Sequence, residues 1–95
     1  MTITHTPWGQ VQYQKEIAEG IVCVATASHG GFVLSDERLA AMPNKYKLNT
    51  YGTGRFFEED CEWGLVVLAF PDAFPVEDHH TARVVAKAMY PTLGL

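Results

Sequence analysis

The segment from Arg55 to Pro71 constrains the fold of this chain more than any other stretch. It begins with aromatic residues, continues through a block of acidic residues, and ends in six apolar residues, Leu65 to Phe70. At about 100° per residue, six successive apolar residues cover the whole circumference of a helix, so a helix here would be buried on all sides. A buried strand fits the same run, because periodicity cannot separate the two cases.

The acidic block favours the helical alternative, over about residues 57–70. The block consists of Glu58, Glu59, Asp60 and Glu62. These carboxylates would lie in the first turns, where the helix dipole favours each negative charge by ~0.3–1 kcal/mol. Pro71 would end the helix, since the residue before a proline is displaced from the α region. Gly64 inside the run predicts that another element packs closely against it. The sequence leaves open whether 63–70 is a helix or a buried strand.

Hydrophobic periodicity predicts three strands before this segment and two further helices. The strands are expected at about 10–17, 21–27 and 31–34, and the helices at about 36–42 and 77–90. Strand 10–17 alternates, with glutamines and Glu16 on a wet outer face, whereas 21–27 is continuously apolar and predicts a central strand covered on both faces. The predicted fold class is α+β: a three-stranded antiparallel β-meander packed against three helices.

Several single residues refine this fold. Trp8 is expected to fold back onto the core as an anchor, and Gly20 is expected to be the left-handed residue of a hairpin. Ser35 is predicted to cap the helix at 36–42, because its hydroxyl can accept from a first-turn N–H group. The polar stretch 44–54 is predicted to be an exposed, mobile loop.

Composition limits the classes of protein to consider. The chain has 95 residues, enough for a single compact domain over 1–95. Its net charge of −4 disfavours nucleic-acid binding, which relies on clustered Lys and Arg. No signal peptide and no membrane span of ~20 apolar residues is apparent. Cys23 and Cys61 lie in no metal-type spacing, so we interpret them as buried thiols of a cytoplasmic protein, with no cofactor assigned.

Ordered motifs along most of the chain resemble a known family. They are Thr6-Pro7-Trp8-Gly9, Gly20-Ile21-Val22, Thr26-Ala27-Ser28-His29-Gly30-Gly31, Leu34-Ser35, Phe57-Glu58-Glu59-Asp60-Cys61-Glu62-Trp63 and Ala69-Phe70-Pro71. Together they resemble the DUF7007 family of small uncharacterised domains from bacterial plasmids, phages and other mobile elements, over roughly residues 6–75. The resemblance implies a mobile-element context and a counter-defence or conjugation accessory role, and it carries no established activity.

The motif Ser28-His29-Gly30-Gly31 is the sharpest local candidate for a site. Its glycines could let the backbone approach a ligand or adopt positive φ. His29 beside them could be a general base or a metal ligand. The structural alternative is a tight turn across which His29 forms hydrogen bonds.

The acidic block could hold a divalent cation together with His29, because carboxylates and imidazole suit manganese, iron or zinc. On a helix, only Glu58 with Glu62, or Glu59 with Glu62, could share a face. The structural alternative is helix-terminus carboxylates with salt bridges to Arg55 or to a basic stripe on the last helix. That stripe consists of His80, Arg83 and Lys87. We therefore assign no metal.

Two functions from different classes follow. The first is a non-enzymatic accessory protein that binds and inhibits a host protein of a defence system. The alternative is a small metal-assisted hydrolase or nucleotide-binding enzyme with His29, Glu58 and Glu59 as catalytic candidates. The candidate binding residues are Ser28, His29, Gly30, Gly31, Glu58, Glu59, Asp60 and Glu62. We expect a host protein as the partner and no membrane; a homodimer is left open.

Overall fold

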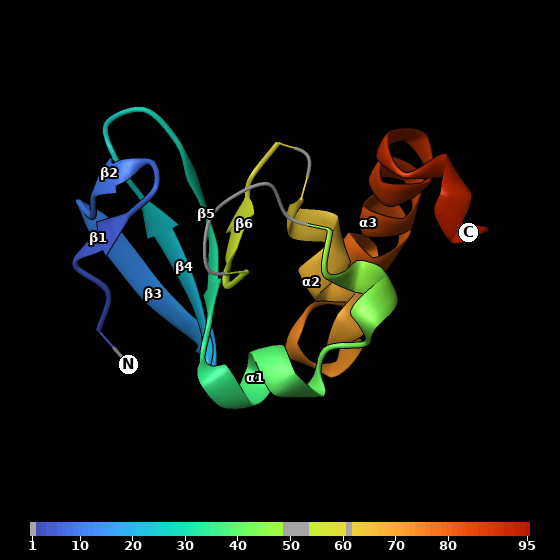
Figure 1. Ribbon diagram of the computed structural model, residues 1–95, viewed down its shortest axis with the longest axis horizontal. Helices are drawn as coiled ribbons and strands as arrows, with labels where there is room; N and C mark the ends of the chain where they lie inside the picture. Colours follow the sequence, from blue (N-terminus) through green and yellow to red (C-terminus); the bar gives the residue numbers. More distant parts are fainter. Residues whose placement is uncertain (1, 49–53, 61) are drawn as a thin grey trace.

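The computed structural model describes residues 2–48, 54–60 and 62–95 and has an α+β architecture (Figure 1). The strands are β1 (His5–Thr6), β2 (Gly9–Gln10), β3 (Tyr13–Ala18), β4 (Ile21–Ala25), β5 (Gly30–Leu34) and β6 (Phe56–Glu58). The helices are α1 (Asp36–Ala41), α2 (Trp63–Ala69) and α3 (Val76–Met89), with short 3-10 helices η1 (Asn44–Tyr46), η2 (Pro71–Ala73) and η3 (Pro91–Leu93).

The main sheet has four antiparallel strands in the order β3-β4-β5-β6, and β1 and β2 form a separate two-stranded sheet. The three predicted strands correspond to β3, β4 and β5, which form the predicted meander. The fourth strand was not predicted. The sequence predicts a helix over about 57–70, but residues 56–58 pair with β5, with Phe57 opposite Phe32.

Phe57 explains this correction. Its side chain is fully buried within the core cluster that also contains Ile21, Leu34 and Leu65. Pairing with β5 satisfies the backbone hydrogen-bonding groups of residues 56–58 and at the same time buries the Phe57 ring. The acidic block then forms the connection to α2, and the helix begins only at Trp63.

The apolar run is helical, and α2 lies between the sheet and α3. Gly64, Leu65, Val66 and Val67 are all buried. Helix α2 contacts β5 and β6 on one side and α3 on the other, which is why it is apolar around its circumference. A Cβ on Gly64 would lie 3.0 Å from the backbone oxygen of Ala82, so the close approach predicted at this glycine is confirmed.

The N-terminal segment covers the central strands on the opposite face of the sheet. The residues predicted to form a wet outer face, Gln10, Gln12, Gln14 and Glu16, are all exposed, so that prediction is confirmed. Trp8 is 7% exposed and packs with Val22, Val24 and Val33. Figure 1 shows β1 and β2 on the side of the sheet that faces away from the helices. Trp8 is therefore the predicted core anchor, and β4 is covered on both faces as predicted.

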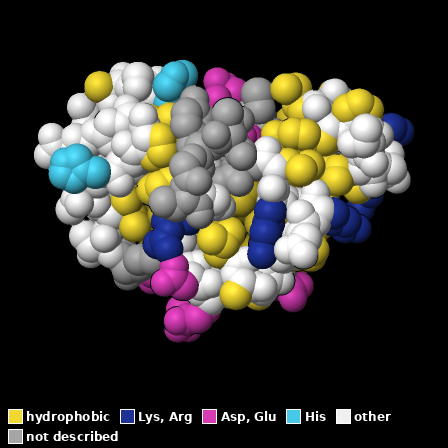
Figure 2. All heavy atoms as spheres, viewed as in Figure 1, with side chains coloured by type: hydrophobic (Ala, Val, Ile, Leu, Met, Phe, Trp, Pro, Cys, Tyr) yellow, Lys and Arg dark blue, Asp and Glu magenta, His cyan; other side chains and the backbone are white. Residues whose placement is uncertain are grey.

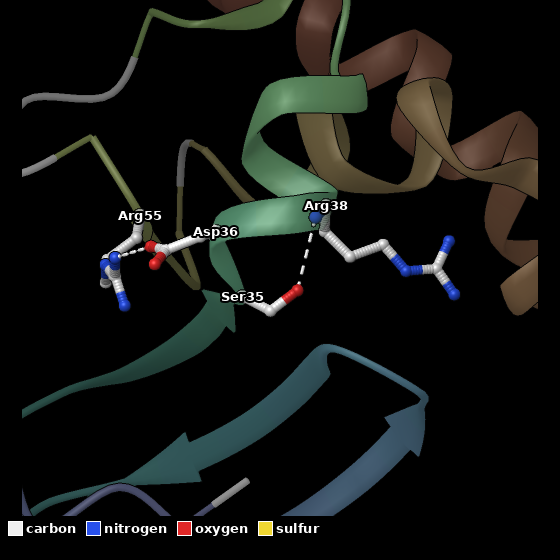
Figure 3. Close-up of polar contacts among 4 residues, drawn as sticks. All are labelled: Ser35, Asp36, Arg38 and Arg55. Carbon is white, nitrogen blue, oxygen red and sulfur yellow. Dashed lines mark hydrogen bonds and ion pairs between the residues drawn. The ribbon is translucent and has the colours of Figure 1, made fainter.

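The segments that connect the strands and helices match the predictions in part. Gly20 has φ of 82°, as a left-handed hairpin residue should. Ser35 accepts from the Arg38 backbone N–H at 3.2 Å and caps α1 (Figure 3). Within the predicted loop 44–54, residues 44–46 form η1 with Tyr46 buried, which contradicts a wholly exposed loop, while 49–53 lie outside the described residues.

Arg38 and Arg55 hold α1 to its surroundings. Arg38 Nε donates to the Glu19 carbonyl oxygen at 2.8 Å, and its guanidinium lies 5.0 Å from the centre of the Phe70 ring. Arg55 forms an ion pair with Asp36 in the first turn of α1 (Figure 3). Among the described residues, no helix is both long and apolar enough to cross a membrane.

Candidate functional site

Two connections lie at the same end of the sheet: the turn 26–29 between β4 and β5, and the connection 59–62 between β6 and α2 (Figure 1). Strand pairing brings them together. Gly31 is opposite Glu58, and the Glu59 N–H donates to the Gly30 carbonyl oxygen at 3.0 Å, which continues the ladder beyond β6.

The two-residue period of a strand sorts these side chains onto two faces. Positions 29 and 31 share a face with 58 and 60, whereas 30 shares the other face with 59. The ligand-type atoms of His29, Glu58 and Asp60 accordingly lie within 4.8 Å of one another. His29 and Asp60 are exposed, and Glu58 is half-buried.

The structure brings together some of the predicted site residues and separates others. His29 and Glu58 are brought together, as the proposed shared site requires. The third member is Asp60, and neither Glu59 nor Glu62 belongs to the group. Helical periodicity paired residues three or four apart, but this segment follows a strand, where residues two apart share a face.

Glu59 lies on the opposite face of the sheet. Its Oε2 atom would be 2.9 Å from a Cβ placed on Gly30. Here it borders an open, largely apolar groove of ≈ 370 Å³, whose other side chains include Tyr13, Phe32 and Trp63. Glu59 therefore belongs to a groove rather than to the His29 group.

Cys23 is half-buried and also lines this groove. Burial raises the pKa of the Cys23 thiol, the Glu59 carboxylate raises the pKa further, and Lys15 lowers it. A thiol of raised pKa is a poor nucleophile at neutral pH. The structure thus places Cys23 less deeply than predicted, and Cys61 is outside the described residues.

The two glycines of Ser28-His29-Gly30-Gly31 allow neighbouring segments to pack closely against β5. Gly30 and Gly31 lie in β5, and neither has positive φ. A Cβ on Gly31 would be 2.2 Å from the Phe57 carbonyl oxygen and 2.7 Å from the Trp8 ring. The absence of a side chain at Gly31 therefore lets β6 and Trp8 approach β5, and the prediction of a glycine turn is wrong.

The turn itself depends on Thr26, which is not among the predicted site residues. The Thr26 hydroxyl accepts from the backbone N–H of His29 at 3.1 Å, and the Thr26 N–H donates to the His29 carbonyl oxygen at 2.8 Å. The Ser28 hydroxyl donates to the Trp8 carbonyl oxygen at 3.0 Å. A threonine three residues before the histidine is the signal of such a turn. Ser28 thus fastens the turn to the N-terminal segment.

Glu62 is buried and holds the backbone of Glu58 through hydrogen bonds. It is 2% exposed, and its Oε1 accepts from the Glu58 backbone N–H at 3.1 Å, while its own N–H donates to the Glu58 carbonyl oxygen at 3.0 Å. The Asp60 N–H donates to Glu58 Oε1 at 2.6 Å. These bonds hold the backbone of Glu58 and of Asp60.

Comparison with known proteins identifies the family of this chain but assigns no activity to it. A family model described as a domain of unknown function (DUF7007) matches residues 1–93. The chain belongs to the DUF7007 family. No curated protein and no solved structure matches it. The family covers nearly the whole chain, including both connections that carry the His29 group.

The remaining charged side chains of this DUF7007 domain are dispersed. Figure 2 shows Lys and Arg side chains scattered among acidic and neutral ones on the face in view, without a continuous basic patch. Arg55 pairs with Asp36. His79 is half-buried; its Nε2 lies 2.7 Å from the Pro71 carbonyl oxygen and 3.0 Å from that of Phe74, so it ties η2 to α3.

Proposed function

We propose that this chain is a non-enzymatic accessory protein of mobile-element type that binds and inhibits a host protein, a component of a defence system. The observation that carries the proposal is the groove on the helix-facing side of the sheet. It is open and mainly apolar, and Tyr13 at its edge is 57% exposed. Exposed apolar surface of this kind is typical of contact sites between proteins.

The groove also suggests the chemistry of the partner. Glu59 lines it and is exposed. A partner segment with a large apolar side chain could fill the groove, while a lysine or arginine beside it meets the Glu59 carboxylate. Such charge complementarity mainly raises the rate of association and the specificity of the contact.

The free edge of the sheet is a less suitable contact. Strand β3 is an edge strand, but Lys15 lies in its middle and its pairing with β4 shifts register between Glu16 and Ala18. Charged residues and bulges on an edge strand disfavour the addition of a further strand. We therefore place the partner in the groove rather than along β3.

The experiment is a pull-down from native host lysate at moderate salt, read out by mass spectrometry, with wild type and two variants. Tyr13→Glu changes the groove, and Val84→Glu makes the same change on α3 at a residue that is 54% exposed. We expect one stoichiometric protein that wild type and Val84→Glu retain and Tyr13→Glu loses. An empty pull-down, or equal retention by Tyr13→Glu, would contradict the proposal.

The second candidate is a small metal-assisted hydrolase or nucleotide-binding enzyme. The observation that favours it is the proximity of His29 to Glu58 and Asp60, because an imidazole beside carboxylates can serve as general base or metal ligand. The assay is hydrolysis of nucleotides and phosphodiesters with Mn²⁺ or Zn²⁺. Activity that His29→Ala abolishes would support this candidate, and a rate equal to buffer would remove it.

A further inference from the structure

We propose that His29, Glu58 and Asp60 bind one divalent transition-metal ion. This inference names the ligand of the group that the second candidate function uses, but it does not require hydrolysis. The ion would join the turn 26–29 to the connection 59–62, two segments that are 30 residues apart in the sequence and adjacent in the sheet.

The register of β5 and β6 builds the group. Glu58 is opposite Gly31, and the Glu59 N–H bond to the Gly30 carbonyl oxygen continues the pairing by one residue, toward His29 and Asp60. The ligand-type atoms of all three residues lie within 4.8 Å of one another. Cross-strand and diagonal neighbours on one face are within reach of one another.

The distances suit a metal after small side-chain movements. The three ligand-type atoms lie within 4.8 Å of one another. Ligands at ~2.0–2.2 Å from one ion are roughly 3–3.5 Å apart, so closure requires shifts on the order of 1 Å. His29 and Asp60 are exposed, and their side chains can make these shifts without disturbing the core.

The backbone of the ligands is already fixed. Thr26 holds the backbone of His29 through the hydrogen bonds of the turn, and Glu62 holds that of Glu58. Glu58 Oε1 accepts the Asp60 N–H, and a carboxylate has about four lone-pair sites, so it can accept this bond and still coordinate a cation. Preorganised ligands reduce the conformational entropy that binding would cost.

The donor set indicates the class of ion. One imidazole nitrogen with two carboxylate oxygens suits Mn²⁺, Fe²⁺, Co²⁺ or Zn²⁺, whereas Mg²⁺ and Ca²⁺ prefer oxygen ligands alone. Three protein ligands leave further coordination positions for water. We therefore expect Mn²⁺ and Zn²⁺ to bind and Mg²⁺ at the same concentration to bind far more weakly.

The test is isothermal titration calorimetry of untagged protein with MnCl₂, ZnCl₂ or MgCl₂ alone, together with the thermal unfolding midpoint in each salt. Mn²⁺ is the primary probe because thiolates bind it poorly, which excludes Cys23 and Cys61 as the source of binding. The variants are His29→Ala and Asp60→Asn. The matched control is Glu59→Gln, which removes one charge from the neighbouring residue on the opposite face.

Wild type and Glu59→Gln should bind one Mn²⁺ and unfold at a higher temperature with the metal than without it. His29→Ala and Asp60→Asn should each weaken binding by at least about 10-fold, since even the loss of an outer-shell partner costs 10–100-fold. The midpoints without metal show whether each variant is folded.

Absence of Mn²⁺ and Zn²⁺ binding by folded wild type would overturn the proposal. The proposal would also be overturned if Glu59→Gln lowered the affinity for Mn²⁺ as much as Asp60→Asn does. Mg²⁺ binding as strong as Mn²⁺ binding would overturn it too, because either result would indicate diffuse attraction of cations to the acidic block. Metal binding without hydrolysis would leave this inference intact and remove only the enzymatic candidate.

Discussion

Substitution of Gly31 by alanine separates the two interpretations of the Ser28-His29-Gly30-Gly31 motif. If the glycine lets a ligand approach, an added methyl group should affect binding and leave folding intact. In the structure the methyl group would lie 2.2 Å from the Phe57 carbonyl oxygen and 3.0 Å from its carbonyl carbon, where ordinary contacts are 3.4–4 Å. The obstacle is backbone, so a side-chain rotation cannot relieve it.

The cost follows from this geometry. Overpacking typically destabilises a protein by ~1–3 kcal/mol, and a fixed backbone obstacle places Gly31→Ala near the upper value. Replacing glycine by alanine also lowers the conformational entropy of the unfolded chain, which stabilises the folded state by ~0.4–1 kcal/mol. The net effect is about 2 kcal/mol, which lowers the unfolding midpoint of a domain of this size by roughly 8–16 °C.

Urea denaturation gives the free energy of unfolding for wild type, Gly31→Ala and a matched control, Gly64→Ala. At Gly64 the nearest backbone atom to an added Cβ is 3.0 Å away, on a separate helix, and alanine improves helix propensity by ~1 kcal/mol. We expect this control to remain within ~1 kcal/mol of wild type. Trp8→Leu combined with Gly31→Ala should not restore stability, because the Phe57 carbonyl remains in place.

A Gly31→Ala protein within ~0.5 kcal/mol of wild type, the range of ordinary surface changes, would refute this reasoning. Restoration of stability by Trp8→Leu would also refute it, since the Trp8 ring rather than the β6 backbone would then be the obstacle.

Two further predictions concern α1 and the groove. Ser35→Ala should lower the free energy of unfolding by ~1 kcal/mol through loss of the cap to the Arg38 N–H, whereas Ser35→Asp should retain it, as measured by urea denaturation; equal stability of the two variants would contradict this. Because burial and Glu59 raise the pKa of the Cys23 thiol, iodoacetamide at pH 8 should modify Cys23 more slowly than free cysteine. Glu59→Gln should accelerate the reaction and Lys15→Gln should slow it, followed by peptide mass spectrometry; the reverse order would contradict the assigned causes.

Short-range physics made much of this fold predictable. Strands β3, β4 and β5 follow from alternating and continuous apolar runs, and the left-handed Gly20 and the Ser35 cap follow from local backbone chemistry. The apolar run of α2 predicted full burial, and Gly64 predicted the close contact with α3. The local pattern of side chains is enough to predict these features, even where the contact itself, such as that of Gly64 with Ala82, joins distant residues.

The fourth strand and the membership of the His29 group depended on long-range pairing. Phe56–Glu58 is too short to show a strand period, and only its partner β5 makes it a strand. Once it is a strand, Glu58 and Asp60 share a face with His29, and Glu59 is directed to the groove. Helical spacing would have produced a different set of neighbours.

The sequence by itself therefore determined the fold class, the central strand and the Trp8 anchor. Only the tertiary structure decided which carboxylates meet His29, that residues 56–58 form a fourth strand, and that Gly31 is a packing residue. The physical reason is that strand register and layer contacts join residues far apart in the chain, and these contacts override the local preference of an acidic segment for a helix N-terminus.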